Sequence, residues 1–189
     1  MKKLFHFLLI FLLLSGCSHS AFEDPIMETE KPELTTLQNM TEKQHGDFVL
    51  QIGSEKKIYK VNEEVKFIAR LKYIGKLPEF RIFHAASPFY FEVKETTRDI
   101  YLPFAMDQPL LSTNLLKGEW LEGEYNKIGL FIDGDDDPNQ IFNTELMKNP
   151  GYPEGEYEVK VTAKFYCADG EKKIDTEFST ESIKVFIRK

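Results

Sequence analysis

Residues 157–167, Tyr-Glu-Val-Lys-Val-Thr-Ala-Lys-Phe-Tyr-Cys, decide the fold class of this chain. Every second residue from Tyr157 to Cys167 is apolar, and most of the residues between them are charged or polar. A period of two places alternate side chains on opposite faces of a β-strand. The stretch therefore predicts a long strand with one face in a hydrophobic core and the other face in water.

The neighbouring residues predict how this strand ends and what it packs with. Ala168-Asp-Gly-Glu171 follows it, and Asp-Gly supplies the positive backbone angle that tight hairpins favour. Ile183, Val185 and Ile187 alternate in the same way and predict a last strand. Further strands are predicted at 48–52, 65–74, 80–86, 89–94, 100–104 and 115–121. Seven or more short strands separated by turns predict an all-β fold of two antiparallel sheets packed face to face.

The residues before the long strand, Pro153-Glu-Gly-Glu-Tyr157, resemble the Pro-x-Gly-x-Tyr entry to the sixth strand of immunoglobulin-like domains. In that family the tyrosine hydroxyl bonds back to the backbone at the corner. The stretch 57–67 is also similar to the first turn of bacterial immunoglobulin-like modules. The resemblance implies an immunoglobulin-like antiparallel β-sandwich. No cysteine precedes Cys167 in the domain and Trp120 lies outside the expected strand, which indicates the bacterial, disulfide-free branch.

A fainter resemblance connects three other segments to the bacterial intracellular-proteinase-inhibitor module. The segments are Gly75, Phe89-Tyr-Phe91 and Lys117-Gly-Glu-Trp120. The resemblance implies a proteinase-inhibitor-like module as an alternative function, but the match is too loose to transfer an inhibitory loop.

An acidic run, Asp133-Gly-Asp-Asp-Asp-Pro-Asn139, is the candidate metal site. Asp133, Asp135, Asp137 and Asn139 could direct several oxygens at one centre, as calcium requires. The run does not fit an EF-hand loop, because Pro138 stands where that loop needs glycine. Calcium is the one cofactor that the sequence suggests.

The same run also predicts the start of one short helix before the sixth strand. Asp137 is a good N-cap and Pro138 suits the first helical position. Ile141, Phe142 and Leu146 would then form the inward stripe of the helix. The helix start and the calcium site do not exclude each other.

Aromatic residues crowd the stretch 80–104. Phe89-Tyr-Phe91 are consecutive, so in a strand Tyr90 points away from its two neighbours. Exposed aromatic surface is typical of binding faces, and Tyr90, Tyr101 and Phe104 are therefore the candidate binding residues. The alternative is that both faces are covered, since aromatic side chains mostly serve packing.

The sequence lacks the motifs of an enzyme. It contains no Gly-rich phosphate loop, no His-Glu-x-x-His and no paired metal-binding cysteines. Cys167 falls on the apolar face of its strand and is expected to be an inert buried thiol. Nothing in the sequence brings His84 to it as a base. We therefore expect no catalytic residues.

Residues 1–17, MKKLFHFLLIFLLLSGC, have the parts of an export signal. Lys2 and Lys3 precede an apolar run, Phe7–Leu14, that is far shorter than the roughly 20 residues of a bilayer span. Leu14-Ser-Gly-Cys17 resembles the bacterial lipobox. The resemblance implies that residues 1–16 are cleaved as a signal peptide and that Cys17 receives a diacylglyceryl group. We expect this lipid to hold the protein at the extracytoplasmic face of the cell membrane.

The composition of the mature chain, residues 17–189, divides it into two parts. Residues 17–46, the lipidated cysteine and a stretch rich in Glu, Thr and Pro, predict a flexible spacer, with a short helix over 34–40 as the alternative. Residues 47–189 suit one immunoglobulin-like domain. The formal net charge is −7, or −9 without Lys2 and Lys3. So acidic a surface disfavours nucleic acid as a partner.

These observations together predict an extracytoplasmic lipoprotein that acts as a non-catalytic binding module. Its partner would be an unknown protein or envelope ligand, and the membrane would be contacted through the lipid on Cys17. A calcium-binding lipoprotein that uses the Asp133–Asn139 loop and a proteinase-inhibitor-like module are the two alternatives.

The lipobox generates the first testable prediction. In the native host, Cys17→Ser should abolish labelling with an alkyne analogue of palmitate and should move the protein out of the membrane fraction, because no acyl chain is then attached. Cys167→Ser is the matched control and should keep the label. An uncleaved leader in the mass spectrum of the natural protein would contradict the prediction.

Overall fold

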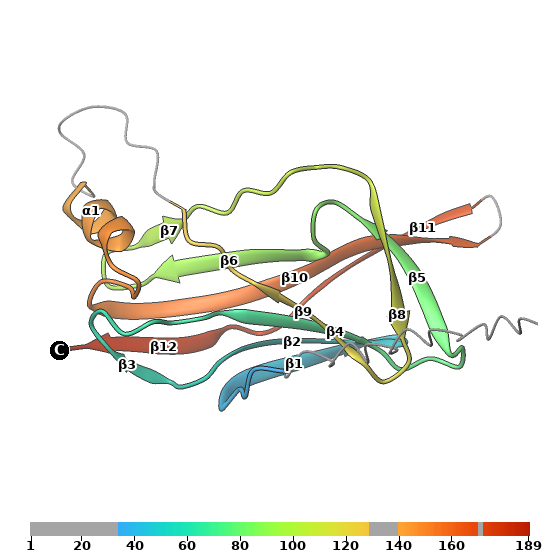
Figure 1. Ribbon diagram of the computed structural model, residues 1–189, viewed down its shortest axis with the longest axis horizontal. Coiled ribbons are helices and arrows are strands. Elements are labelled where there is room, and N and C mark those ends of the chain that lie inside the picture. Colours follow the sequence, from blue (N-terminus) through green and yellow to red (C-terminus); the bar gives the residue numbers. More distant parts are fainter. Residues whose placement is uncertain (1–33, 129–139, 170–171) are drawn as a thin grey trace, which may run out of the picture. The chain divides into compact units, whose positions relative to one another are not determined.

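The computed structural model describes residues 34–128, 140–169 and 172–189, which belong to one compact unit that begins at Leu34 (Figure 1). These residues form twelve strands and one helix. The strands are β1 (Asn39–His45), β2 (Phe48–Ser54), β3 (Ile58–Lys60), β4 (Ile68–Tyr73), β5 (Glu79–His84), β6 (Phe89–Glu95), β7 (Ile100–Leu102), β8 (Leu111–Leu116), β9 (Trp120–Glu124), β10 (Gly155–Asp169), β11 (Lys172–Ser179) and β12 (Ile183–Arg188), and the helix is α1 (Gln140–Lys148).

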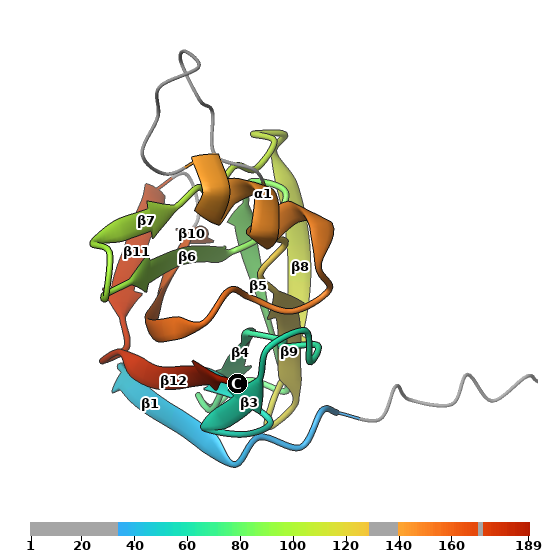
Figure 2. The same ribbon diagram turned by 90° about the vertical axis from the view of Figure 1, so that its left-hand side faces the viewer.

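The strands form two sheets. The first has the order β1-β2-β4-β9, and the second runs β3-β12-β10-β5-β8, with β6 and β11 also paired to β10 and β7 paired to β6. All named pairs are antiparallel except β3 with β12. Figure 2 shows β1, β4 and β9 on one side of the molecule and β6 and β7 on the other. The prediction of a mostly β, antiparallel fold with one short helix is confirmed, and the arrangement fits a β-sandwich.

The core lies between the sheets and is supplied by both of them. Phe48 of β2 meets Phe165 of β10 edge to face, with the ring centroids 5.0 Å apart. Leu50 and Leu71 from the first sheet and Val185 from the second are fully buried. Apolar side chains of two sheets thus interdigitate in one cluster, and their removal from water is the main force that holds the sheets together.

Strand β10 is the long strand that the alternating sequence predicts. It spans 15 residues, and its first half pairs with β6 and β12 while its second half pairs with β11 and β5. Tyr157, Val159, Val161 and Ala163 are fully buried, as predicted. Cys167 is only half-buried, so the prediction of a buried thiol is wrong. The reason is that β10 pairs with β5 at Tyr166, and the residues that follow pair with β11.

The corner before β10 has the hydrogen bond that the immunoglobulin-like motif predicts. The Tyr157 hydroxyl donates to the Pro153 carbonyl at 2.8 Å, and the tyrosine is completely buried. The Tyr152 ring packs edge to face on the Tyr157 ring, with centroids 5.3 Å apart. The hydroxyl therefore satisfies a buried carbonyl at the point where the chain turns into the sheet.

The compact unit begins earlier than the sequence predicts. Residues 39–45, which the sequence analysis assigns to the spacer, form β1 and pair with the whole of β2, from Asn39 opposite Ser54 to His45 opposite Phe48. The alternative of a helix over 34–40 is also wrong, since these residues are extended or irregular. Backbone pairing with β2, and not a buried face, holds this edge strand in place. Both faces of β1 therefore carry polar residues, and the sequence shows no alternation of apolar and polar side chains there.

Two further differences concern predicted element boundaries. The single strand expected at 115–121 is two strands, β8 and β9, in different sheets, because Gly118 adopts a φ of 80° between them. Phe142 and Leu146 of α1 are buried as predicted, but Ile141 is 75% exposed. Its expected inward position is therefore wrong.

The proposed capping residues of the helix, Asp137 and Pro138, lie outside the described residues. No helix in the described part of the chain is long and apolar enough to span a membrane.

A buried carboxylate closes the turn between β6 and β7. Glu95 is completely buried and accepts hydrogen bonds from the backbone N–H of Thr97 at 2.9 Å and of Arg98 at 2.8 Å. The Arg98 guanidinium lies 3.3 Å from the same carboxylate. It also lies 5.5 Å from the ring centroid of Phe142 in α1 and donates a hydrogen bond to the Glu154 carbonyl. Glu95 thus connects the turn to the helix and to the entry of β10.

These contacts determine the pKa of the Glu95 carboxyl. Burial alone would raise the pKa, but the hydrogen bonds from Thr97 and Arg98 outweigh it and lower the pKa below the ordinary glutamate value.

The corner generates a second prediction. Tyr157→Phe should lower the free energy of unfolding by about 1–3 kcal/mol, because it leaves the buried Pro153 carbonyl without a donor. Urea unfolding followed by circular dichroism measures this difference. Tyr101→Phe is the control: the residue is 58% exposed, so the loss of its hydroxyl should change the free energy of unfolding little. Equal effects of the two substitutions would contradict the role of the corner.

Glu95 generates a third prediction, on pH dependence. Because the pKa of Glu95 is lowered in the folded chain, its stabilising contribution is present at neutral pH and is lost as the pH falls below the unfolded value of about 4.3. Glu95→Gln should therefore cost about 1–3 kcal/mol at pH 7, and the gap to the wild type should narrow in acid. Glu156→Gln, at an exposed ion pair with Arg188, should show no such gap. A gap that stays constant down to pH 3 would refute the assignment.

Candidate functional site

A groove of about 540 Å³ lies on the solvent face of β10 and β11, the face opposite to the core. Strands β5 and β6 and the segment before β8 complete its walls. The side chains that give it its chemical character are Phe83, Tyr90, Gln108, Pro109, Leu110, Lys164, Tyr166, Lys173, Asp175 and Glu177.

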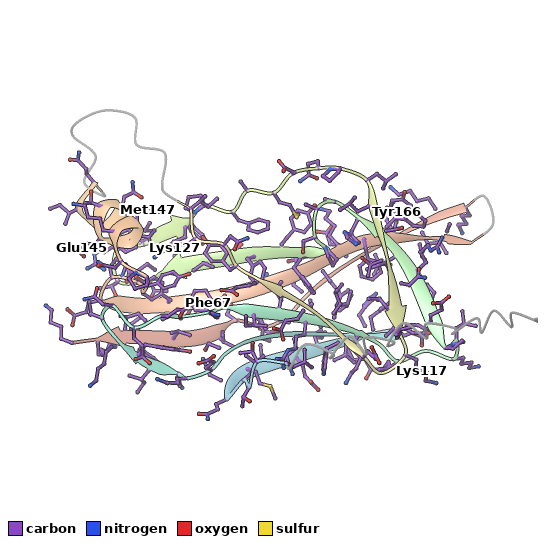
Figure 3. All side chains as sticks on the ribbon, in the orientation of Figure 1. Phe67, Lys117, Lys127, Glu145, Met147 and Tyr166 are labelled. Atoms are coloured by element: carbon purple, nitrogen blue, oxygen red, sulfur yellow. The ribbon has the colours of Figure 1, made fainter. Side chains whose placement is uncertain are left out.

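A stacked pair of rings forms one part of the groove. Tyr166 of β10 lies directly opposite Phe83 of β5, and the two rings stack at a centroid distance of 5.0 Å and an interplanar angle of 12°. The Lys173 ammonium lies 4.5 Å from the Tyr166 centroid. Figure 3 shows Tyr166 where β10 and β11 meet β5. Cross-strand stacking fixes these rings, so the groove presents a preformed aromatic surface.

A second aromatic contact lies further along the groove. The Tyr90 ring packs against the Phe104 ring at 5.9 Å, and the Lys164 ammonium lies 5.6 Å from the Tyr90 centroid. Phe104 is only partly buried and packs on the core from the edge. Tyr90 therefore lines the groove and contacts the hydrophobic core through the Phe104 ring.

The charges of the groove occur as two opposite pairs. Lys164 lies 3.0 Å from Glu177, and Lys173 lies 2.9 Å from Asp175. The hydrogen bond to Glu177 raises the pKa of Lys164. Each pair offers donors and acceptors together, while the four side chains carry no net charge. The groove consequently suits a ligand that is polar but uncharged and that has an apolar face to place on the rings.

His84 lies beside the groove as a positioned structural residue. Its Nδ1 is 2.7 Å from the Ala85 carbonyl and therefore donates to it, and its Nε2 is 2.8 Å from the Thr113 hydroxyl. Both ring nitrogens are thus occupied by the protein itself. The Cys167 sulfur has its contact at 3.9 Å with the Ile174 carbonyl, so within the described residues these two side chains do not form a nucleophile and base pair.

A second polar cluster lies at the α1 end of the molecule, where Figure 3 labels Lys127 and Glu145. Lys127 donates to the carbonyls of Asn149 at 2.5 Å and Gly151 at 2.8 Å, and burial lowers the pKa of its ammonium. It also lies 5.3 Å from the Tyr152 ring centroid. These contacts join two chain segments and leave no donor arrangement that points to a ligand.

The structure brings together two of the three predicted binding residues. Tyr90 lines the groove and Phe104 supports it. Tyr101 does not join them. It lies on β7 opposite Lys94 of β6, and the Lys94 ammonium is 4.9 Å from the Tyr101 ring centroid. The proposed lipidation residue, Cys17, and the proposed calcium ligands Asp133, Asp135, Asp137 and Asn139 lie outside the described residues. Within those residues, no group of three or more His, Cys, Asp or Glu could hold a metal ion.

The sequence indicated one side of the groove, since Phe83 and Tyr90 lie in the aromatic stretch 80–104. The charged residues of β11 carried no local signal, because they become neighbours of β10 only through strand pairing. A weak signal did exist for Tyr166 and Lys164, since the alternation of residues 157–167 already places both on the solvent face. An aromatic ring on a predicted solvent face was the feature that could have indicated a binding surface.

No protein-family model matches the chain, and searches of curated proteins and of solved structures give no match either. The geometry of the site is therefore the basis for its function.

Proposed function

We propose that this chain is a lipid-anchored, extracytoplasmic binding module that has an immunoglobulin-like fold and performs no catalysis. The lipobox of residues 14–17 supports the anchor, and the apolar run before it supports export. The groove on β10 and β11 is the proposed ligand site.

Two features support the immunoglobulin-like fold. The hydrogen bond from the Tyr157 hydroxyl to the Pro153 carbonyl is the corner interaction typical of these domains. The two mostly antiparallel sheets share a core, and Cys167, the one cysteine among the described residues, is a free thiol. Both features agree with the disulfide-free bacterial branch that the sequence resembles.

The observation that carries the binding function is the combination of half-buried rings and ion pairs on β10 and on the strands paired with it. Core packing on the opposite face of β10 fixes the backbone beneath Lys164 and Tyr166. A ligand that enters the groove therefore meets groups that are already positioned, which reduces the entropy cost of binding. The proposed ligand is a neutral polar molecule or segment at the cell envelope, with an apolar face that packs on Tyr90 and Tyr166.

The absence of catalysis is proposed from the partners of the two reactive side chains. The described contacts of His84 and of Cys167 are made to Ala85, Thr113 and Ile174, and none is a contact between the two. A nucleophile needs an adjacent base or a lowered pKa.

The groove generates a fourth prediction. The native lipoprotein is purified from membranes after chemical cross-linking, and the cross-linked partner is quantified. Tyr166→Ala and Tyr90→Ala should each reduce the recovered partner about tenfold or more, because a central aromatic anchor contributes on the order of 1–2 kcal/mol or more to an interface. Tyr101→Ala removes an exposed tyrosine outside the groove and should leave recovery unchanged. Equal recovery with all three variants would exclude the groove as the binding site, and turnover by the purified protein would overturn the non-catalytic assignment.

A further inference from the structure

Strand β8 is an edge strand without the usual protection against pairing. Six described strands, β1, β3, β7, β8, β9 and β11, have a single strand partner each. Edge strands in soluble proteins are usually very short or carry charged side chains that discourage another strand from pairing. β3 and β7 have three residues each, and β1, β9 and β11 all contain charged residues. β8, Leu-Ser-Thr-Asn-Leu-Leu, has six residues and no charge.

The apolar side chains around this edge are also exposed. Leu110 is 69%, Leu111 45% and Leu116 49% exposed. The inner edge of β8 pairs with β5 from Leu111 opposite His84 to Leu116 opposite Glu79. On its outer edge, the backbone contact within the described residues is at the C-terminal end of the strand, where the Leu116 carbonyl accepts from the Glu119 N–H. The outer edge thus offers unpaired backbone groups flanked by leucines.

We propose that β8 pairs with β8 of a second copy of this chain, antiparallel and with Thr113 at the two-fold axis. A two-fold axis perpendicular to the sheet keeps each residue on its own face. Leu115 is buried and faces the core, so Leu111 and Thr113 share its face, while Leu110, Ser112, Asn114 and Leu116 lie on the solvent face.

The register around Thr113 is self-complementary. It places Leu110 opposite Leu116 of the second copy, Leu111 opposite Leu115, and Ser112 opposite Asn114, and each of these pairs occurs twice. Opposite residues in an antiparallel pair have Cβ atoms about 4.5–5.5 Å apart, which is contact distance for leucine side chains. The register therefore covers all three exposed leucines and pairs no charged residues within 110–116; the Arg81 guanidinium of each copy donates to the Asn114 side chain of the same copy. The same leucines form both sides of this contact. A second copy of the chain is therefore the partner that these residues specify.

The dimer would also extend the groove. Leu110 belongs to the groove wall, and Leu116 of the second copy packs beside it in this register. Each groove then receives one side chain from the other copy. An interface built on one six-residue strand is small, so the dimer is weak in solution.

The first test is the mass in solution of the mature chain, residues 17–189, with Cys17→Ser so that no lipid is attached. Sedimentation velocity over about 1–300 µM covers the range expected for a weak interface. The wild-type sequence should pass from monomer to dimer with rising concentration. Ser112→Lys places an ammonium at the interface twice and should weaken the dimer at least about tenfold. Met40→Lys, on the exposed edge strand β1, is the matched control and should dimerise as before. A wild-type chain that stays monomeric throughout would overturn the proposal, as would an unchanged dimer with Ser112→Lys.

The second test fixes the register and does not depend on the groove. In a chain with Cys17→Ser and Cys167→Ser, no thiol remains, and Ser112→Cys and Asn114→Cys are introduced in separate samples. Opposite residues have Cα atoms about 4.5–5.5 Å apart, within the range of a disulfide. Mild oxidation should cross-link the mixture of the two variants at least about tenfold faster than either variant alone. Equal rates in the three samples would overturn the proposed pairing even if a dimer forms.

Discussion

Backbone hydrogen bonds along both edges of β10 hold four other strands in register, and the rest of the structure depends on that arrangement. Val159 lies between Val93 of β6 and Ile183 of β12, while Tyr166 lies between Phe83 of β5 and Asp175 of β11. A slip of one residue would turn every core side chain of β10 into water. The same slip would move the groove residues into the core. Fold and candidate site are therefore specified by one register.

The two ends of β10 have different roles. At its start, the Tyr157 corner and the buried Glu95 carboxylate anchor the strand to neighbouring turns and to α1. At its far end the burial decreases, Cys167 is half-buried, and the solvent face carries the paired charges of the groove. The anchoring contacts lie at the turn before the strand, and the groove chemistry lies on the solvent face of the second half, opposite the buried Ala163 and Phe165. This separation allows groove residues to change without loss of the fold.

The alternation from Tyr157 to Phe165 was sufficient to predict the fold class, the central strand and its buried face, and the Pro-x-Gly-x-Tyr motif predicted the corner hydrogen bond. Phe142 and Leu146 correctly predicted the buried side of the helix. β1 could not be predicted, because its polar residues are held by pairing with β2 and leave no periodic pattern. The groove was only partly predictable, through Tyr90, since Phe83 and Tyr166 meet across a strand pair that local sequence does not encode.

The shared backbone of core and groove also has a practical consequence for identifying the ligand. Lys164 and Tyr166 belong to the strand whose other face is inseparable from the hydrophobic interior, so they cannot be released unless the whole unit unfolds. Any small molecule that occupies the groove stabilises the native state by mass action, with about 2.7 kcal/mol at a hundredfold excess over its dissociation constant. Heat denaturation of the intact chain is thereby a reporter of groove occupancy. Compound libraries can be screened by differential scanning fluorimetry without an assay of biological activity.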